Sequence, residues 1–195
     1  MLRRLILAIP VLTLSILALC APAFAAELEI GAKAPDFKAL PGVDGKTYSL
    51  ADMKDAKAVV VCFTCNECPV AIAYEDRFAE FTKKYKDKGV KFIAINARAK
   101  SEDLAKMKIR AEEKGFNFPY VAEESRTLAG QYGARVTPHI FVLDQNRAVA
   151  YVGAFDDKPD AAPTKHYVAD AVDAILAGKK VEVTNTRAVG CGIPK

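Results

Sequence analysis

The chain has 195 residues, a formal net charge of +4 and five cysteines, and it contains no tryptophan. This length suits one domain with a processed leader. Hydrophobic residues at 51% and charged residues at 27% exclude a disordered chain and a multi-span membrane protein. The mild charge gives no indication of nucleic-acid binding, and the sparse cysteines exclude a miniprotein built on disulfides. The functional information therefore lies in the positions of the cysteines.

The first 25 residues have the pattern of a secretory signal peptide. Two arginines at positions 3 and 4 precede an apolar stretch at residues 5–19, and a small-x-small cleavage motif ends at Ala25. The apolar stretch is shorter than the roughly 20 residues that cross a bilayer. We therefore predict an exported protein, periplasmic or extracellular, with no stable membrane span after cleavage and a membrane tether only if the leader is kept. A lipoprotein acylated at Cys20 is the alternative, and the large residue before that cysteine disfavours it.

Cleavage after Ala25 separates a leader from the mature chain, and the mature chain consists of a domain and a tail. These are a signal peptide at residues 1–25, one domain at residues 26–180 and a C-terminal tail at residues 181–195. Cleavage also removes Cys20, and the cysteines that remain are Cys62, Cys65, Cys68 and Cys191. Export places these thiols in a compartment where disulfides can persist.

The mature chain begins with an extended lead-in, followed by a strand–helix–strand unit. Turn residues crowd positions 27–49 and predict a hairpin at Asp44-Gly45. Residues 58–63 form a continuous apolar, β-branched run, which is typical of a strand buried on both faces. The next segment predicts a helix whose apolar stripe consists of Val70, Tyr74, Phe78, Phe81 and Tyr85. Gly89 ends this helix, and residues 90–95 predict a second strand parallel to the first.

The second half of the mature chain predicts further helices and a hairpin. In chain order these are a helix capped by Ser101 and ended by Gly115, an extended piece at 118–121, a short helix capped by Ser125, strands at 139–143 and 148–152, and a last helix at 167–176. This order predicts an α/β fold in which a mixed central sheet is covered by helices on both faces.

A cluster of cysteines lies where the first buried strand ends and the first helix begins. Cys65 and Cys68 form a C-x-x-C pair there, followed by Pro69. A helix N-terminus offers unpaired N–H groups and a partial positive charge, which favour the reactive thiolate. Two intervening residues let the second sulfur attack a mixed disulfide formed on the first. The pattern therefore indicates thiol–disulfide exchange.

The C-N-x-C-P motif at residues 65–69, together with Thr137-Pro138 directly before a predicted strand, resembles the thioredoxin-like superfamily. The chain looks most similar to exported thioredoxin-like proteins of the redoxin (AhpC/TSA-type) branch, over roughly residues 31–178. The resemblance implies a thioredoxin-like fold in which Thr137 and Pro138 form a cis-proline loop that binds substrate beside the cysteine pair. The tail segment Gly190-Cys191-Gly192 is similar to tails of that branch, though less specifically.

The resemblance also implies an exported thiol–disulfide oxidoreductase in which Cys65 attacks and Cys68, one turn further into the helix, resolves the mixed disulfide. The implied partners are protein thiols or disulfides and an external electron donor or acceptor, without a cofactor, a metal or nucleic acid. The direction of electron flow depends on the reduction potential of the pair. A permanent disulfide, or a buried thiol pair without turnover, is the structural alternative.

Several positions depart from familiar thioredoxins. Thr64 stands where thioredoxins have tryptophan, and Val59 stands where they have a buried aspartate that helps to deprotonate the second thiol. Glu67 lies between the two cysteines, and its charge disfavours a neighbouring thiolate. We therefore expect Glu67, with Asn66 beside it, to tune the pair toward a less oxidising couple. The effect is modest if the Glu67 side chain points into solvent.

Two other activities stay open as alternatives. A thiol-dependent peroxidase of the same branch needs a Pro-x-x-x-Thr/Ser-x-x-Cys loop, and neither Cys65 nor Cys68 follows that pattern, so only weak antioxidant activity is expected. A soft-metal site would use Cys62, Cys65 and Cys68 with His139, although copper-delivery proteins of this superfamily have a motif one residue longer.

Three further residues carry expectations of their own. Cys62 lies in the apolar strand and is expected to be a small core residue, with a third redox thiol as the alternative. Cys191 lies in a tail that we expect to be loose, and its partner is unassigned. His139 follows Pro138 and is expected to be a hydrogen-bonded strand-end histidine rather than a group that tunes the dithiol.

Overall fold

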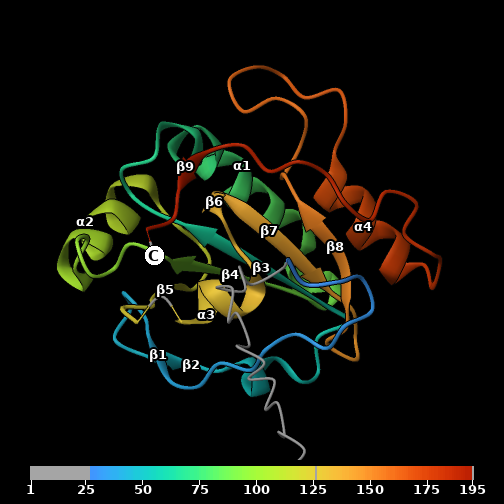
Figure 1. The fold of residues 1–195 in the computed structure, drawn as a ribbon, viewed down its shortest axis with the longest axis horizontal. Helices are drawn as coiled ribbons and strands as arrows, with labels where there is room; N and C mark the ends of the chain where they lie inside the picture. The colour runs from blue at the N-terminus through green and yellow to red at the C-terminus, as the bar shows by residue number, and fades with distance from the viewer. Residues whose placement is uncertain (1–26, 126, 195) are drawn as a thin grey trace, which may run out of the picture.

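The computed structural model describes residues 27–125 and 127–194, and its centre is a five-stranded sheet (Figure 1). The strand order is β5-β4-β3-β7-β8. The strands are β3 (Ala58–Thr64), β4 (Val90–Asn96), β5 (Tyr120–Ala122), β7 (His139–Leu143) and β8 (Val149–Gly153). Strands β3, β4 and β5 run parallel, whereas β7 is antiparallel to both β3 and β8. The prediction of a mixed sheet is confirmed.

Within the described residues, four α-helices cover the sheet. They are α1 (Pro69–Tyr85), α2 (Leu104–Lys114), α3 (Thr127–Tyr132) and α4 (Tyr167–Leu176), with short 3₁₀ turns η1 (Leu50–Met53) and η2 (Lys86–Lys88). Successive residues of β3 point to opposite faces, as the pleat of a strand requires. Val60 and Cys62 pack into the cluster shared with α1, α2 and α4, whereas Val61 and Phe63 pack into the cluster shared with α3. This alternation explains why every residue of the strand is buried.

Two small sheets lie outside the central one. Strands β1 (Leu40–Pro41) and β2 (Thr47–Tyr48) form the hairpin predicted at Asp44-Gly45. Strands β6 (Val136–Thr137) and β9 (Cys191–Gly192) pair antiparallel, although 54 residues separate Thr137 from its partner Cys191. The C-terminal segment, red in Figure 1, reaches β6 by crossing from α4 over the end of α1. The expectation of a loose tail is wrong, because main-chain pairing holds this segment on the domain.

The N-terminal cap of α2 also differs from the prediction. Asp103, rather than Ser101, is the capping residue, and its Oδ1 accepts a hydrogen bond of 2.9 Å from the Lys106 amide. The Ser101 hydroxyl instead donates to the Arg98 carbonyl at 3.0 Å, within the turn before the helix. Both residue types suit the cap position, so the register of the turn decides between them.

The leader cannot be compared with the structure. The predicted signal peptide and Cys20 lie outside the described residues. Within the described part of the chain, every helix is too short or too polar to cross a membrane.

Candidate active site

The two cysteines of the C-x-x-C motif lie at the junction between β3 and α1. Cys65 directly follows the last residue of β3, and Cys68 is the N-cap residue of α1. Pro69 takes the first helical position, where its missing N–H leaves no hydrogen bond unmade. Both cysteines are free thiols, and only 2% of Cys65 and 1% of Cys68 is exposed. The strand-to-helix placement predicted from the sequence is therefore confirmed.

Thr137 connects the two sulfurs to the loop before β7. The Thr137–Pro138 peptide bond is cis, as expected. The Sγ atom of Cys65 lies 3.2 Å from the Thr137 hydroxyl, and the Cys68 thiol donates to the Thr137 carbonyl at 2.9 Å. The structure thus brings Cys65 and Cys68 together with the Thr137–Pro138 loop from a distant part of the sequence, and the catalytic and substrate-binding roles of these residues stay predictions.

Cys191 is a third sulfur at the same site. Its backbone N–H donates to Cys68 Sγ at 3.3 Å, and the Thr137 hydroxyl lies 3.4 Å from its carbonyl oxygen. The side chain of Cys191 is half-buried and packs against the cluster of Cys65, Cys68 and Ala71. The sequence analysis left Cys191 without a partner, and the structure supplies one.

The thiols differ in acidity because their neighbours differ. Burial raises the pKa of the Cys65 thiol, and although the Thr137 hydroxyl lowers it, the charge of Glu102 adds to the increase. Burial also acts to raise the pKa of Cys68, but hydrogen bonds from Cys191, the Ala71 backbone and Thr137 together outweigh it and leave that pKa lowered. With the tail in place, Cys68 is the thiol that deprotonates more easily. The order in which Cys65 attacks and Cys68 resolves stays a prediction.

A buried carboxylate supports the turn between the cysteines. Glu102 is 1% exposed and accepts hydrogen bonds from the Asn66 amide at 2.6 Å and the Glu67 amide at 3.3 Å. Asn96 Nδ2 also donates to it, at 2.8 Å. Tyr120 completes the network, since its hydroxyl donates to Asn66 Oδ1 at 2.7 Å. Asn66 is therefore an anchor of the turn, whereas the Glu67 side chain is exposed.

Glu102 was not predicted from the sequence, and Glu67 was expected to be the carboxylate that tunes the cysteine pair. We predict that Glu102→Gln lowers the pKa of Cys65 and increases its alkylation rate at neutral pH several-fold, because a buried negative charge opposes a nearby thiolate. Alkylation with iodoacetamide across pH, in a Cys62→Ala/Cys68→Ser background, measures Cys65 alone within its tryptic peptide. The exposed Glu67→Gln serves as the matched control, and an equal effect from both variants would contradict the assignment to Glu102.

Cys62 and His139, for which structural roles were predicted, are both buried. Cys62 is 0% exposed in the core cluster, and burial raises the pKa of its thiol well above the usual value. His139 is buried too, its Nδ1 accepts from the Arg135 amide at 3.3 Å, and its Nε2 lies 2.9 Å from Glu27 Oε1. Burial lowers the pKa of His139. Among the described residues, histidine, cysteine, aspartate and glutamate form no group of three or more placed to hold a metal ion.

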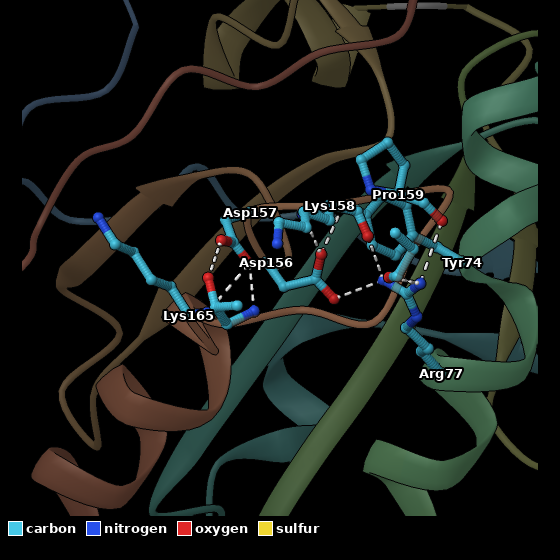
Figure 2. A network of polar contacts seen from close by, with 9 residues as sticks. Tyr74, Arg77, Asp156, Asp157, Lys158, Pro159 and Lys165 are labelled. Atoms are coloured by element: carbon cyan, nitrogen blue, oxygen red, sulfur yellow. Dashed lines mark hydrogen bonds and ion pairs between the residues drawn. The ribbon is translucent and has the colours of Figure 1, made fainter.

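A cavity of about 220 Å³ lies beside Pro138. Val70 and Tyr74 of α1, Phe155 of the loop after β8 and Val189 of the tail contribute to its walls. Figure 2 shows how that loop is held on α1: Asp156 accepts a 2.7 Å hydrogen bond from Arg77 and a 2.8 Å hydrogen bond from Tyr74. The cavity is thus a mainly apolar recess beside Pro138, and the ion pair of Asp156 with Arg77 fixes one of its walls.

Comparisons with known proteins agree with this geometry. The model of the AhpC/TSA family matches residues 30–152. Thiol-disulfide oxidoreductase ResA of Bacillus thuringiensis (strain Al Hakam) is 31% identical over 126 residues, which are 63% of this chain and 68% of that protein. Peroxiredoxin-2 of Macaca fascicularis is 30% identical over 135 residues, which are 65% of this chain and 62% of that protein.

Solved structures show the same fold. The hypothetical protein SMc02350 from Sinorhizobium meliloti 1021 has a TM-score of 0.79 and 35% identity, and the match covers 86% of this chain and 95% of that one. A putative thiol:disulfide interchange protein DsbE from Chlorobium tepidum has a TM-score of 0.65 and 26% identity, over 77% of this chain and 99% of that one. The thioredoxin-like fold predicted from the sequence is confirmed.

Proposed function

The chain belongs to the AhpC/TSA family, and from that premise we propose that it is a thiol–disulfide oxidoreductase whose redox pair is Cys65 and Cys68. One observation carries the assignment: both sulfurs lie within hydrogen-bond distance of Thr137, at 3.2 Å for Cys65 and 2.9 Å for Cys68. A pair of thiols at a helix N-terminus, set against an extended backbone segment, suits exchange with a disulfide in another polypeptide.

The exchange proceeds in two balanced steps. The Cys65 thiolate attacks one sulfur of a substrate disulfide, which forms a mixed disulfide and releases the other substrate sulfur as a thiolate. The Cys68 thiolate then attacks Cys65, which forms the Cys65–Cys68 disulfide and releases the second substrate thiolate. Two electrons pass from the protein to the substrate, and the same steps in reverse oxidise a substrate dithiol. The potentials of the couples determine which direction prevails.

The residues around the pair have supporting roles in this proposal. The backbone of Thr137 and the ring of Pro138 position the substrate segment beside the sulfurs, and the recess beside Pro138 accepts one of its apolar side chains. Asn66 fixes the turn through its hydrogen bond with Tyr120. Glu67 tunes the redox pair only weakly, because its side chain is exposed and water screens its charge.

Similar proteins favour exchange over peroxide reduction. The ResA relative and the DsbE structure both carry names for thiol–disulfide chemistry, and the peroxiredoxin relatives match at a slightly lower identity, 30% against 31% for ResA. The Pro-x-x-x-Thr/Ser-x-x-Cys loop of efficient thiol peroxidases does not precede Cys65 or Cys68.

Reduction of insulin disulfides by the full chain tests the proposal, with dithiothreitol as electron source. We expect Cys65→Ser to abolish the activity above the dithiothreitol background, while the buried Cys62→Ala retains it. Undiminished activity in Cys65→Ser would overturn the proposal. Peroxide consumption is measured in parallel, and fast turnover that depends on Cys65 would instead assign the protein as a peroxidase.

Export is a separate part of the proposal. The basic start, apolar stretch and Ala25 cleavage motif support secretion, and a compartment in which disulfides persist suits the proposed redox pair. Expression of the full chain in a bacterium and N-terminal sequencing of the product test this. We expect a periplasmic protein that starts at Ala26, and an intact cytoplasmic chain would contradict export.

A further inference from the structure

Residues 184–194, at the end of the described chain, follow a defined path over the domain. The Val152 amide donates to the Thr184 carbonyl at 2.9 Å, and the Thr186 amide donates to the Val152 carbonyl at 3.0 Å. A Cβ atom at Gly153 would lie 2.3 Å from the Thr186 carbonyl oxygen. The tail therefore follows β8 so closely that only glycine fits beneath it at this point.

The tail then adds a strand beside the substrate loop. Thr137 pairs with Cys191 and Val136 pairs with Gly192, in antiparallel register. The Ile193 amide donates to the Arg135 carbonyl at 2.9 Å, next to this pair. Addition of a strand to an exposed edge is a common way in which proteins bind extended peptides. Under the proposed function, a substrate polypeptide would use this same edge of Thr137.

A close approach of two backbones fixes the tail at this point. An ideal Cβ at Gly190 would lie 1.9 Å from the Thr137 carbonyl oxygen and 2.6 Å from its carbonyl carbon. Arg98 adds a contact from another element, since its Nη2 donates to the Gly192 carbonyl at 2.8 Å. These contacts hold Cys191 against the cluster of Cys65, Cys68 and Ala71.

The sulfur that Cys191 approaches is that of Cys68. The Cys191 amide donates to Cys68 Sγ at 3.3 Å, and a hydrogen bond with Cys68 raises the pKa of the Cys191 thiol while lowering that of Cys68. Cys65 faces the Thr137 hydroxyl instead. Of the two cysteines in the motif, Cys68 is thus the natural exchange partner of the tail.

We propose that Cys191 is a third redox-active thiol, which forms a disulfide with Cys68, and that the strand of residues 190–193 is a tethered mimic of the substrate polypeptide. This inference rests on the proposed function and extends it. The substrate it implies is an extended segment with an accessible cysteine, which replaces the tail strand on the edge of Thr137.

The proposed step redistributes one disulfide without an external oxidant or reductant. Once reduction of a substrate disulfide has produced the Cys65–Cys68 disulfide, the Cys191 thiolate attacks Cys68 Sγ. The new bond joins Cys68 and Cys191, the Cys65–Cys68 bond breaks, and the electron pair leaves on Cys65 as a thiolate. The protein stays oxidised by two electrons, while Cys65 becomes free to attack again and the Cys68–Cys191 disulfide becomes the bond that an external thiol reductant would attack.

Peptide mapping can detect the new bond directly. Trypsin leaves Cys62, Cys65 and Cys68 on the peptide of residues 58–77 and leaves Cys191 on the peptide of residues 188–195. The full chain is equilibrated with glutathione disulfide, free thiols are blocked with iodoacetamide, and the digest is analysed by mass spectrometry. We expect the two peptides to be linked in the wild type and in Cys62→Ala/Cys65→Ser, where Cys68 is the only partner left on residues 58–77.

Matched variants decide the outcome. The link should be lost in Cys62→Ala/Cys68→Ser and in Cys191→Ser, both of which keep a cysteine of the original motif. If Cys62→Ala/Cys65→Ser carries only glutathione adducts, or if the link joins two chains on a non-reducing gel, the inference is wrong. Insulin reduction is measured on separate portions of the wild-type protein that are kept reduced and are not treated with iodoacetamide. Failure of that assay with the link present would contradict the proposed function and leave the Cys68–Cys191 bond standing.

Discussion

Gly190→Ala is expected to open the site and to speed alkylation of Cys68 by iodoacetamide about tenfold, since loss of one or two backbone hydrogen bonds shifts the opening equilibrium by about 1.4 kcal/mol. The added methyl group would lie 1.9 Å from the Thr137 carbonyl oxygen, a distance that two backbones cannot accommodate without moving apart. The strand pairing of Thr137 with Cys191 is then lost. The rate is read from the modified tryptic peptide in a Cys62→Ala/Cys65→Ser background, where Cys68 is its only thiol.

The same variant should also weaken two properties that depend on Cys191. The Cys68–Cys191 disulfide should form more slowly, and the pKa of Cys68 should rise, because two of the hydrogen bonds that lower it come from Cys191. The ratio of the variant's alkylation rate to that of the parent should therefore be largest at high pH, where Cys68 is a thiolate in both proteins. At low pH the advantage of the open site shrinks, because fewer Cys68 thiols are ionised in the variant.

Gly192→Ala is the matched control. It adds the same methyl group two residues later in the tail, where no described atom lies within 4 Å of the new Cβ. We expect its alkylation rate and its Cys68–Cys191 linkage to equal those of the parent. Equal acceleration in both variants would show that general loosening of the tail, rather than the close approach at Gly190, controls access to the dithiol.

The fold and the cysteine pair were accessible from the sequence because their signals are local. Residues 58–63 are apolar at every position, as a strand with two covered faces requires. In the helix after Pro69, apolar residues recur at intervals of three and four residues. Thr137-Pro138 was found through a short motif before a strand. Each of these patterns lies within a few residues, so no knowledge of tertiary contacts was needed.

The positions of Glu102 and of the tail could not be predicted from local sequence patterns. Glu102 binds the Asn66 amide across 36 residues, and a single buried carboxylate leaves no periodic pattern in the sequence. The tail was expected to be loose because residues 181–195 lack helical or strand periodicity. Its order comes from main-chain pairing with Thr137 and from the absence of a side chain at Gly190, which depend on contacts between distant segments.

The buried ion pair in Figure 2 should make the largest single-residue contribution to stability outside the apolar core. We expect Asp156→Ala to lower the free energy of unfolding by about 3 kcal/mol, because it leaves Arg77 and the Tyr74 hydroxyl without their acceptor. The Asp156 side chain is 2% exposed, whereas that of Arg77 is 23% exposed and keeps backbone acceptors at Lys158. Because Arg77 stays partly solvated, the expected loss lies at the lower end of the range of destabilisation for a broken buried ion pair. Urea unfolding followed by far-ultraviolet circular dichroism measures the change.

Two comparisons separate the lost charge pair from a loss of side-chain volume. Asp156→Asn keeps an oxygen for the Tyr74 hydroxyl and loses the negative charge, so about half of the destabilisation should remain. Glu112→Ala removes an exposed partner of Lys108, with a nitrogen–oxygen distance of 3.9 Å, and should cost less than about 0.5 kcal/mol. Because Asp156 also holds the wall of the recess beside Pro138, Asp156→Ala should raise the KM for insulin more than it lowers kcat. Similar losses of stability in Asp156→Ala and Glu112→Ala would show that the ion pair does not anchor the loop to α1.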